Sequence, residues 1–200
     1  MNQLDLEKFS KFEITKTLPF YADNCKCYFG KDIAGDFIES ISNATNNFYI
    51  ITDITIQDKY KYLLNYKCIV LKSNIKASLR ICNKIIKDLS LSDLQIDFLI
   101  SFGSGTINDI TKYVAYKLNI PYISIASALS MNGYTSSNAS LIYKKLKQSF
   151  SGRLASIVVF DYIVLKDAPF YLTKSGFLDT LAIITANFDI VISNLFKNTT

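Results

Sequence analysis

The chain has 200 residues, half of them hydrophobic, so it is long enough to bury the core of one domain or one and a half. Its net charge of +5 is modest and spread along the sequence, which disfavours nucleic acid as a partner. The sequence contains no histidine, so the usual general base and the commonest zinc ligand are absent from any chemistry that the chain performs alone.

The cysteines predict reduced thiols. Cys25, Cys27, Cys68 and Cys82 form neither a C-x-x-C pair nor a regular framework, and residues 1–10 carry no secretory signal. We therefore expect a cytoplasmic protein. The spacing of Cys25 and Cys27 fits a metal contact or, more simply, alternation along a strand.

Strands and helices alternate through the first half of the chain. Residues 1–21 are irregular apart from a lead-in strand, and a short strand is expected at 26–29. Ile33, Phe37 and Ile41 then mark an amphipathic helix, with Asp32 as its N-cap. Further strands are predicted at 48–52 and 67–71, and further helices at 58–66 and 75–89.

The stretch 96–113 organises the rest of the chain. An apolar run from Ile96 to Phe102 meets Gly103 and Gly105, and a helix follows. Strand, glycine turn and helix in this order can hold a phosphate, because glycine lets the backbone come close and the free N–H groups of the helix point at the anion. A plain tight turn uses the same glycines, so both interpretations stand.

This alternation predicts an α/β fold, with a Rossmann-like parallel sheet and flanking helices. Ligands of such sheets lie at the carboxyl ends of the strands, where we expect Asp53 and the turn from Gly103 to Gly105. Asp53 could accept a hydrogen bond from the 2′-hydroxyl of an adenosine ribose, which would favour NAD over NADP. It could equally be a helix cap or turn residue.

Small polar residues dominate the next region. A strand at 121–125 leads into the stretch 124–140, whose hydroxyls suit a phosphate, a sugar or a solvated loop. Residues 141–153 carry four basic side chains and are interpreted mainly as an exposed hairpin or loop, with a phosphate or nucleic-acid contact as the alternative. A long strand or strand pair is expected at 156–165, and a turn opened by Pro169 and ended by Gly176.

A long helix ends the chain. It carries one apolar stripe of Phe177, Leu181, Ile184, Phe188, Val191 and Leu195. Polar residues interrupt the helix, so we expect no membrane span, and its apolar face needs a partner. We predict an α/β domain at 1–168, the first helix of an incomplete all-α domain at 169–200, and an oligomer or partner contact through 177–196.

Three motifs resemble the sn-glycerol-1-phosphate dehydrogenases, within the dehydroquinate synthase-like and iron-containing alcohol dehydrogenase group. They are G-S-G-T-I-N-D-I-T-K-Y at 103–113, S-M-N-G-Y-T-S at 130–136, and A-P followed after a gap by G-F-L-D-T-L-A at 168–182. The resemblance covers roughly residues 48–189. It implies a Rossmann-like domain that binds NAD(P), a helical domain, a divalent metal (zinc or nickel) in the cleft, and a small phosphorylated substrate.

The resemblance also implies site residues. Asp53 and Gly103 lie at the predicted cofactor edge, and the motifs assign to the pyrophosphate turn Gly105, Thr106, Ile107, Asn108 and Asp109. They assign to the nicotinamide loop Ser127, Ala128, Leu129, Ser130 and Ser136. Asn132 matches a substrate-binding aspartate, and Asp179 matches the aspartate that binds the metal and lies at the substrate.

Departures from the family pattern leave two hypotheses. Asn132 replaces an aspartate, Leu178 replaces a glycine before the metal-binding aspartate, and nothing matches the family's two metal-binding histidines. The chain is therefore either the nucleotide-binding half of an NAD(P)-dependent, metal-assisted oxidoreductase acting on glycerol phosphate, or a non-catalytic nucleotide- or sugar-phosphate-binding module of the same fold. A phosphate-elimination chemistry is a third alternative.

Overall fold

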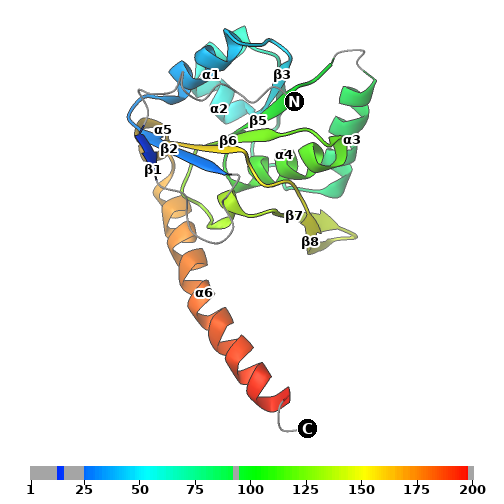
Figure 1. The fold of residues 1–200 in the computed structure, drawn as a ribbon, viewed down its shortest axis with the longest axis vertical. Helices are drawn as coiled ribbons and strands as arrows, with labels where there is room; N and C mark the ends of the chain where they lie inside the picture. The colour runs from blue at the N-terminus through cyan, green and yellow to red at the C-terminus, as the bar shows by residue number, and fades with distance from the viewer. Residues whose placement is uncertain (1–12, 16–24, 92–94, 198–200) are drawn as a thin grey trace.

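A seven-stranded sheet, in the order β1-β2-β9-β6-β5-β3-β4, forms the centre of the computed structural model (Figure 1). The structure describes residues 13–15, 25–91 and 95–197. β1 is antiparallel to β2, and every other pair of neighbouring strands in this order is parallel. The strands are β1 (Glu13–Thr15), β2 (Lys26–Gly30), β3 (Phe48–Asp53), β4 (Cys68–Leu71), β5 (Phe98–Gly103), β6 (Tyr122–Ala126) and β9 (Ile157–Asp161). The predicted parallel, Rossmann-like sheet is confirmed.

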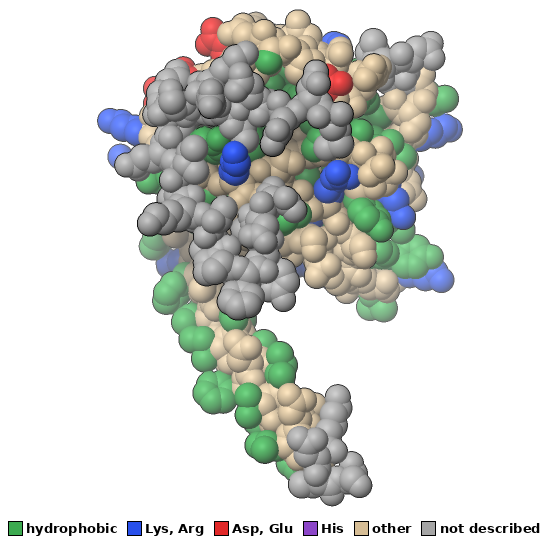
Figure 2. All heavy atoms as spheres, viewed as in Figure 1, with side chains coloured by type: hydrophobic (Ala, Val, Ile, Leu, Met, Phe, Trp, Pro, Cys, Tyr) green, Lys and Arg blue, Asp and Glu red, His purple; other side chains and the backbone are tan. Residues whose placement is uncertain are grey.

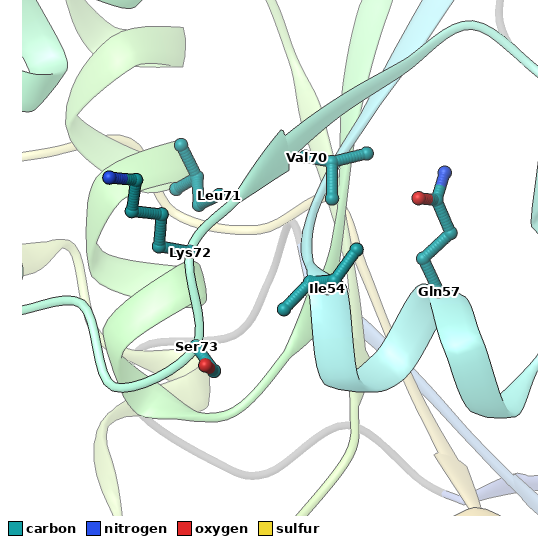
Figure 3. A pocket seen from close by; sticks show the side chains of 6 residues that line it. All are labelled: Ile54, Gln57, Val70, Leu71, Lys72 and Ser73. Atoms are coloured by element: carbon teal, nitrogen blue, oxygen red, sulfur yellow. The ribbon is translucent and has the colours of Figure 1, made fainter.

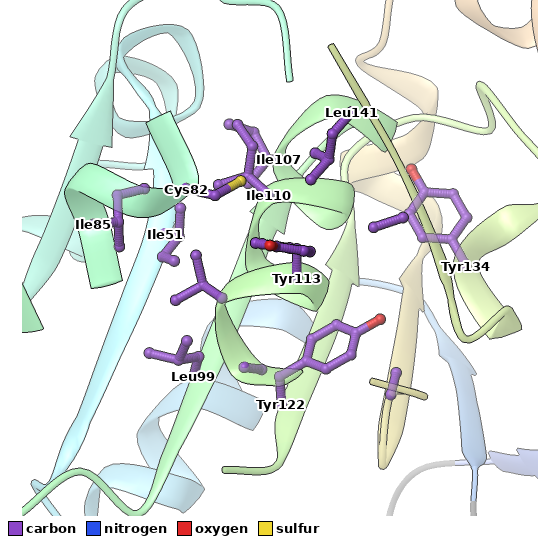
Figure 4. Close-up of a cluster of buried hydrophobic side chains, with 14 of the residues drawn as sticks. Ile51, Cys82, Ile85, Leu99, Ile107, Ile110, Tyr113, Tyr122, Tyr134 and Leu141 are labelled. Atoms are coloured by element: carbon purple, nitrogen blue, oxygen red, sulfur yellow. The ribbon is translucent and has the colours of Figure 1, made fainter. Parts of the chain in front are cut away.

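Both faces of the sheet are covered, because successive strand residues such as Ile50 and Ile51 belong to different core clusters. One face packs against α1 (Ala34–Ser42), α2 (Ile54–Lys59), the 3-10 helix η2 (Lys61–Asn65) and α5 (Tyr162–Lys166). The other packs against α3 (Leu79–Ser90), α4 (Gly105–Leu118) and β7 (Asn138–Tyr143), with the buried side chains shown in Figure 4. β7 pairs with β8 (Leu146–Ser151) in a hairpin. The predicted hairpin within 141–153 is confirmed, although it begins three residues earlier.

The two central strands are buried along their whole length. Every residue of β5 and of β6 is buried, which explains why both read as continuous apolar runs. Their polar exceptions, Ser101 and Ser124, lie directly opposite each other in the strand register. Ser101 Oγ donates to Ser124 Oγ at 3.1 Å, and Ser124 Oγ donates to Asn108 Oδ1 of α4 at 2.9 Å. This buried polar chain fixes α4 against the strands that precede and follow it.

The predicted N-cap of α1 is wrong. Asp32 has a φ of 59°, and Ile33 occupies the cap position without a side-chain hydrogen bond. The Asp161 carboxylate, at the end of β9, caps α1 instead. It accepts from Asp32 N at 3.0 Å and from Ala34 N at 2.8 Å, and also from Ile163 N of α5 at 2.8 Å. Local sequence spacing could not show a cap that comes from the other end of the domain.

Three other predicted element boundaries are corrected. The strand expected at 156–165 ends at Asp161, and residues 162–166 form α5. A continuous apolar run does not by itself distinguish strand from helix. The Asp161 carboxylate caps α5, and so the chain changes from strand to helix at this residue. The helix expected at 75–89 begins only at Leu79, and the one expected at 58–66 is divided into α2 and η2. The lead-in prediction lies largely outside the described residues, apart from β1.

The last helix, α6 (Phe170–Lys197), extends away from the sheet and its covering helices (Figure 1). The turn predicted to end at Gly176 is wrong, because Gly176 lies inside α6. By length and composition, residues Phe170–Phe196 could cross a membrane, with a mean hydropathy of 1.4 and 6% of the apolar window buried. The core helix of a soluble protein meets the same criteria, so a single such helix is weak evidence. The expectation of no membrane span stays a prediction.

We expect Asp161→Ala to lower the free energy of unfolding by about 2 kcal/mol, because it leaves the first N–H groups of two helices without their acceptor. Urea denaturation would measure the change. Asp161→Asn keeps one acceptor oxygen and should lose less. Equal stability of wild type and Asp161→Ala would contradict the double cap.

Candidate functional site

The carboxyl ends of β4, β3, β5 and β6 lie side by side along one edge of the sheet. The register pairs Asp53 with Leu71 and Gly103 with Ala126, and β3 pairs with β5 between them. Asp53 and the glycine turn therefore lie on the same edge, as predicted. This is the edge at which open parallel sheets bind ligands.

Helix α4 begins directly after the glycine turn. Ser104 occupies its N-cap position with extended backbone and makes no side-chain cap hydrogen bond. Gly103 is required by packing, since a Cβ there would lie 2.5 Å from Ile107 Cγ1. Among the described residues, the side-chain group that reaches the first N–H groups of α4 is the Ser130 hydroxyl, 3.5 Å from Gly105 N. The first turn of α4 can therefore donate to an anion and offers the positive end of its dipole.

The loop that follows β6 folds over this turn. Ser127 N donates to Gly103 O at 3.0 Å. A Cβ built on Gly105 would lie 2.7 Å from Met131 Sδ, so the Met131 side chain covers this glycine. The glycine turn and the loop thus enclose one small region at the sheet edge. Sequence analysis did not single out Met131, because a methionine in a polar loop gives no signal of what it covers.

The side chains predicted for the pyrophosphate turn point in different directions. Thr106 is partly exposed at the edge, whereas Ile107 is buried in the core and Asn108 accepts from Ser124. The Nδ2 of Asn108 is buried without a hydrogen-bond partner among the described residues. Asp109 lies near Lys112. For Ile107, Asn108 and Asp109, any contact with a phosphate would come from the backbone, because these side chains face the protein interior.

Lys112 of α4 forms hydrogen bonds to the loop that follows β6. Its side chain is fully buried, and its Nζ donates to Gly133 O at 2.9 Å and to Asn138 O at 3.0 Å. These carbonyls lie at η3 (Gly133–Thr135) and at the start of β7. Burial lowers the pKa of Lys112, an effect opposed by Asp109 Oδ1 at 3.8 Å. Sequence analysis missed Lys112 because a lysine outside the apolar stripe of a helix normally faces water.

The residues predicted for the nicotinamide end are only partly accessible. Ser127 and Ala128 are buried, and Ala128 O accepts from Tyr134 Oη at 2.7 Å. Leu129 is exposed and Ser130 is half-buried at the glycine turn. Ser136 lies further along the loop, where its Oγ accepts from Asn138 N at 3.1 Å. Ser130 is therefore the member of this set that the structure brings to the glycine turn.

Asn132 and Asp179 join the loop to α6. Asn132 N donates to Asp179 Oδ2 at 2.9 Å, and Asn132 Nδ2 donates to Asp179 O at 3.3 Å. Gly176, one helical turn earlier, allows this contact, because a Cβ there would lie 2.1 Å from Leu129 O. The structure thus brings together the two residues predicted to meet the substrate, although they come from different elements.

Asp53 caps α2. Its Oδ1 accepts from Thr55 N at 2.9 Å and from Ile56 N at 3.1 Å. Next to it lies an open pocket of about 560 Å³ (Figure 3). The pocket is lined by Ile54, Gln57, Val70, Leu71, Lys72 and Ser73. The helix-cap interpretation of Asp53 is confirmed, and its position also leaves the ribose interpretation in place.

The described residues do not by themselves provide a metal centre. No group of three or more histidine, cysteine, aspartate or glutamate side chains comes together in the described part of the chain. Asp179 stands with Asn132, whose N–H groups donate and supply no metal ligand there. Cys25, Cys68 and Cys82 are free thiols, and burial raises the pKa of Cys68 to about 11 and that of Cys82 to about 12. The role of Asp179 as a metal ligand stays a prediction.

A parallel sheet covered on both faces, with a glycine turn that leads into an uncapped helix at its carboxyl edge, defines a Rossmann-like α/β protein. The family model described as iron-containing alcohol dehydrogenase matches residues 34–169. The chain belongs to this family.

Relatives in the family carry a more specific name. The chain is 39% identical over 99 residues to glycerol-1-phosphate dehydrogenase [NAD(P)+] of Bacillus velezensis, a match that covers 50% of the chain and 25% of that protein. It is 26% identical over 206 residues to the enzyme of the same name from Bacillus subtilis, covering 96% of the chain and 52% of that protein. The chain therefore spans about half the length of this relative.

Solved structures agree on the fold. The crystal structure of glycerol dehydrogenase from Schizosaccharomyces pombe matches with a TM-score of 0.64 at 20% identity. The match covers 86% of the chain and 45% of that protein. The common architecture is thus shared across a wide sequence distance.

Gly176→Ala should destabilise the chain by about 1 kcal/mol or more, although alanine normally stabilises a helix interior relative to glycine. The reason is the Leu129 carbonyl, which would have to move together with the contact between Asn132 and Asp179. Urea denaturation would measure the effect, with Ser175→Ala as the neighbouring exposed control. A gain in stability would show that α6 does not pack closely on the loop.

Proposed function

We propose that the chain is the nucleotide-binding part of an NAD(P)-dependent, metal-assisted oxidoreductase that transfers hydride between nicotinamide and glycerol phosphate or dihydroxyacetone phosphate. The observation that carries this proposal is the glycine turn at the centre of the carboxyl edge, leading into α4, whose N-cap residue Ser104 makes no side-chain hydrogen bond to the first turn. The names of the relatives support the same cofactor and substrate.

The order of strands suggests how a dinucleotide would lie. Adenosine would lie beside Asp53 at the ends of β4 and β3, and the pyrophosphate at Gly105 and Thr106, on the N–H groups of the first turn of α4, where it would replace the Ser130 hydroxyl as acceptor for Gly105 N. The nicotinamide would reach the loop at Ser130 after β6. Met131 would have to move aside, and its flexible side chain can do so at low cost.

The substrate would lie beyond the nicotinamide, between the loop and α6. Asn132 and Asp179 are the polar groups at this place, and their mutual hydrogen bonds fix the loop against the helix. When bound, NAD(P) supplies the hydride chemistry, and the protein contributes orientation of the reacting carbons. In this proposal Asp179 contributes a carboxylate to a divalent metal, for which the described residues provide no group of three ligands.

The alternative is a non-catalytic module that binds a nucleotide or a sugar phosphate. Asn132 in place of an aspartate favours it, as does the absence of histidine from the sequence. Both proposals place a phosphate group of the ligand at the glycine turn, at Gly105. They differ in whether the chain catalyses a reaction of the bound cofactor. Oxidation of NADH by dihydroxyacetone phosphate, with zinc or nickel present, would rule out the non-catalytic module.

We further propose a cytoplasmic location and a small phosphorylated substrate, with no nucleic acid as partner, by analogy with the named relatives. The division into a nucleotide-binding domain at 1–168 and a helical segment at 169–200 places the boundary between α5 and α6. This division remains part of the proposal.

Calorimetric titration of the chain with NADH should show micromolar binding. Zinc or nickel should not change the affinity, because the glycine turn and the first turn of α4 contain no metal ligand. Gly105→Val should abolish this binding, since the branched side chain would fill the space that a phosphate needs. Gly105→Ala should weaken it less, because the Met131 side chain can yield.

Far-ultraviolet circular dichroism and urea denaturation of both variants provide the control that the fold is retained. Unchanged NADH affinity in Gly105→Val would show that the glycine turn has only a structural role. Absence of binding by the wild-type chain would refute nucleotide binding.

A second prediction concerns α6, whose apolar stripe is exposed on the surface (Figure 2). The stripe consists of Phe177, Leu181, Ile184, Phe188, Val191 and Leu195. An apolar surface of this size favours association in water. The chain should therefore form oligomers by light scattering, and Leu181→Glu combined with Phe188→Glu should shift it toward monomer. Asn187→Glu is the matched control, and a monomeric wild-type chain would contradict the expected association.

A further inference from the structure

The net charge of the chain, predicted to be spread along the sequence, is concentrated in one stretch. Between Asp109 and Asp161 the sequence has six basic residues and no acidic residue, an excess larger than the net charge of +5 for the whole chain. Lys112 is buried in this stretch, and the other five basic residues lie at the end of α4, on the β7–β8 hairpin and just after it. They are Lys117, Lys144, Lys145, Lys147 and Arg153.

Aromatic contacts join the hairpin and the end of α4 into one surface. Lys144 Nζ lies 5.3 Å from the centre of the Tyr143 ring, and Lys117 Nζ lies 5.4 Å from the centre of the Tyr113 ring. The ring of Phe150 connects the two, with its centre 6.5 Å from that of Tyr143 and 5.9 Å from that of Tyr113. Blue and green side chains meet at the lower right of the body in Figure 2, where Figure 1 shows the hairpin.

The turn of the hairpin is strained. The strand register pairs Tyr143 with Leu146, so Lys144 and Lys145 form a two-residue turn. Their φ angles are 49° and 67°, in the left-handed region. Turns of this kind favour asparagine and glycine, because most side chains are strained in this conformation. The chain therefore holds two lysines at the turn at the expense of stability, and strained backbone of this kind is typical of binding sites.

The hairpin tip, which we define as residues 143–147, is both basic and apolar. Leu146 is 64% exposed and Tyr143 is 40% exposed, although both are large hydrophobic side chains. Within the described part of the chain, Lys144 and Lys145 form no ion pair. Lysines of this kind attract anionic lipid headgroups, and exposed leucine and tyrosine side chains can enter the boundary between headgroups and acyl chains.

A nucleic acid fits the hairpin tip less well than a lipid surface does. Phosphate groups of a nucleic acid would contact the lysines but leave Leu146 in water. The arginine of this stretch, which would suit a base edge, is already engaged, because Arg153 Nη1 donates to Asn119 Oδ1 at 2.9 Å. The combination of charge and apolar exposure therefore favours lipid.

We propose that the hairpin tip binds the surface of an anionic lipid bilayer, with Lys144, Lys145 and Lys147 at the headgroups and Tyr143 and Leu146 at the acyl boundary. Binding of this kind is peripheral and requires no membrane span. It is independent of the proposed function, because the hairpin tip contains none of the residues assigned to the nucleotide.

The experiment is flotation of the full chain with vesicles of phosphatidylcholine, with and without phosphatidylserine. The chain should bind only the vesicles that contain phosphatidylserine, and binding should fall as salt rises. Lys144→Asn combined with Lys145→Gly should weaken binding by about tenfold or more, because each basic residue near an anionic surface contributes to the affinity. The same variant should have a higher urea midpoint, because asparagine and glycine relieve the strain of the turn. Weaker binding by a more stable variant separates lipid contact from a structural role.

A matched control lies on the other face of the sheet. Lys31 and Lys166 are exposed beside α1 and within α5, which cover the face opposite to the hairpin. Lys31→Gln combined with Lys166→Gln removes the same charge and should bind vesicles as the wild type does.

Four results would overturn the proposal. They are no binding to either kind of vesicle, equal binding to both, which would assign it to the apolar stripe of α6, equal weakening in the control and the hairpin variant, and binding of duplex DNA in place of vesicles. NADH affinity, measured separately, should be the same in the wild type and the hairpin variant. Failure of this proposal and failure of the proposed function are therefore distinguishable.

Discussion

A buried ammonium group, Lys112 Nζ, holds the loop after β6 against α4, and the candidate site depends on that attachment. The loop carries Ser130 to the glycine turn and Asn132 to α6. A lysine in a protein interior is unfavourable unless its donors are satisfied, and the carbonyls of Gly133 and Asn138 satisfy two of them. These hydrogen bonds compensate the desolvation of Lys112, and they form only when the loop takes this position. Burial of Lys112 therefore holds the loop in a defined place at the carboxyl edge.

Two glycines allow the loop after β6 to pack closely against α4 and α6. Gly105 leaves room for Met131 above the first turn of α4, and Gly176 leaves room for the Leu129 carbonyl beside α6. The second contact lets Asn132 reach Asp179 and so connects the sheet to the base of the long helix. Beyond Asp179, α6 carries an exposed apolar stripe, and an apolar surface of this size favours association in water.

Sequence patterns predicted the central architecture well where burial controls the pattern. β5 and β6 are buried on both faces, so their apolar runs could be interpreted without knowing their neighbours. Sequence patterns failed where a residue distant in the chain caps a helix. Asp161 ends β9, caps α5 and also caps α1, and no local spacing around Asp32 could show that. Gly176 was interpreted as a break because a glycine in a helix and a glycine in a turn look alike in sequence.

The sequence by itself determined the parallel α/β fold, the glycine turn before α4 and the family, because local apolar period and motif order depend on near neighbours in the chain. It also placed Asp53 at the carboxyl edge, since that follows from the end of a strand. Only the tertiary structure decided which side chains share the edge. The contacts of Met131 with Gly105 and of Asn132 with Asp179 depend on loop packing. Those contacts join segments far apart in sequence, and their geometry follows from how the whole sheet and its covering helices pack.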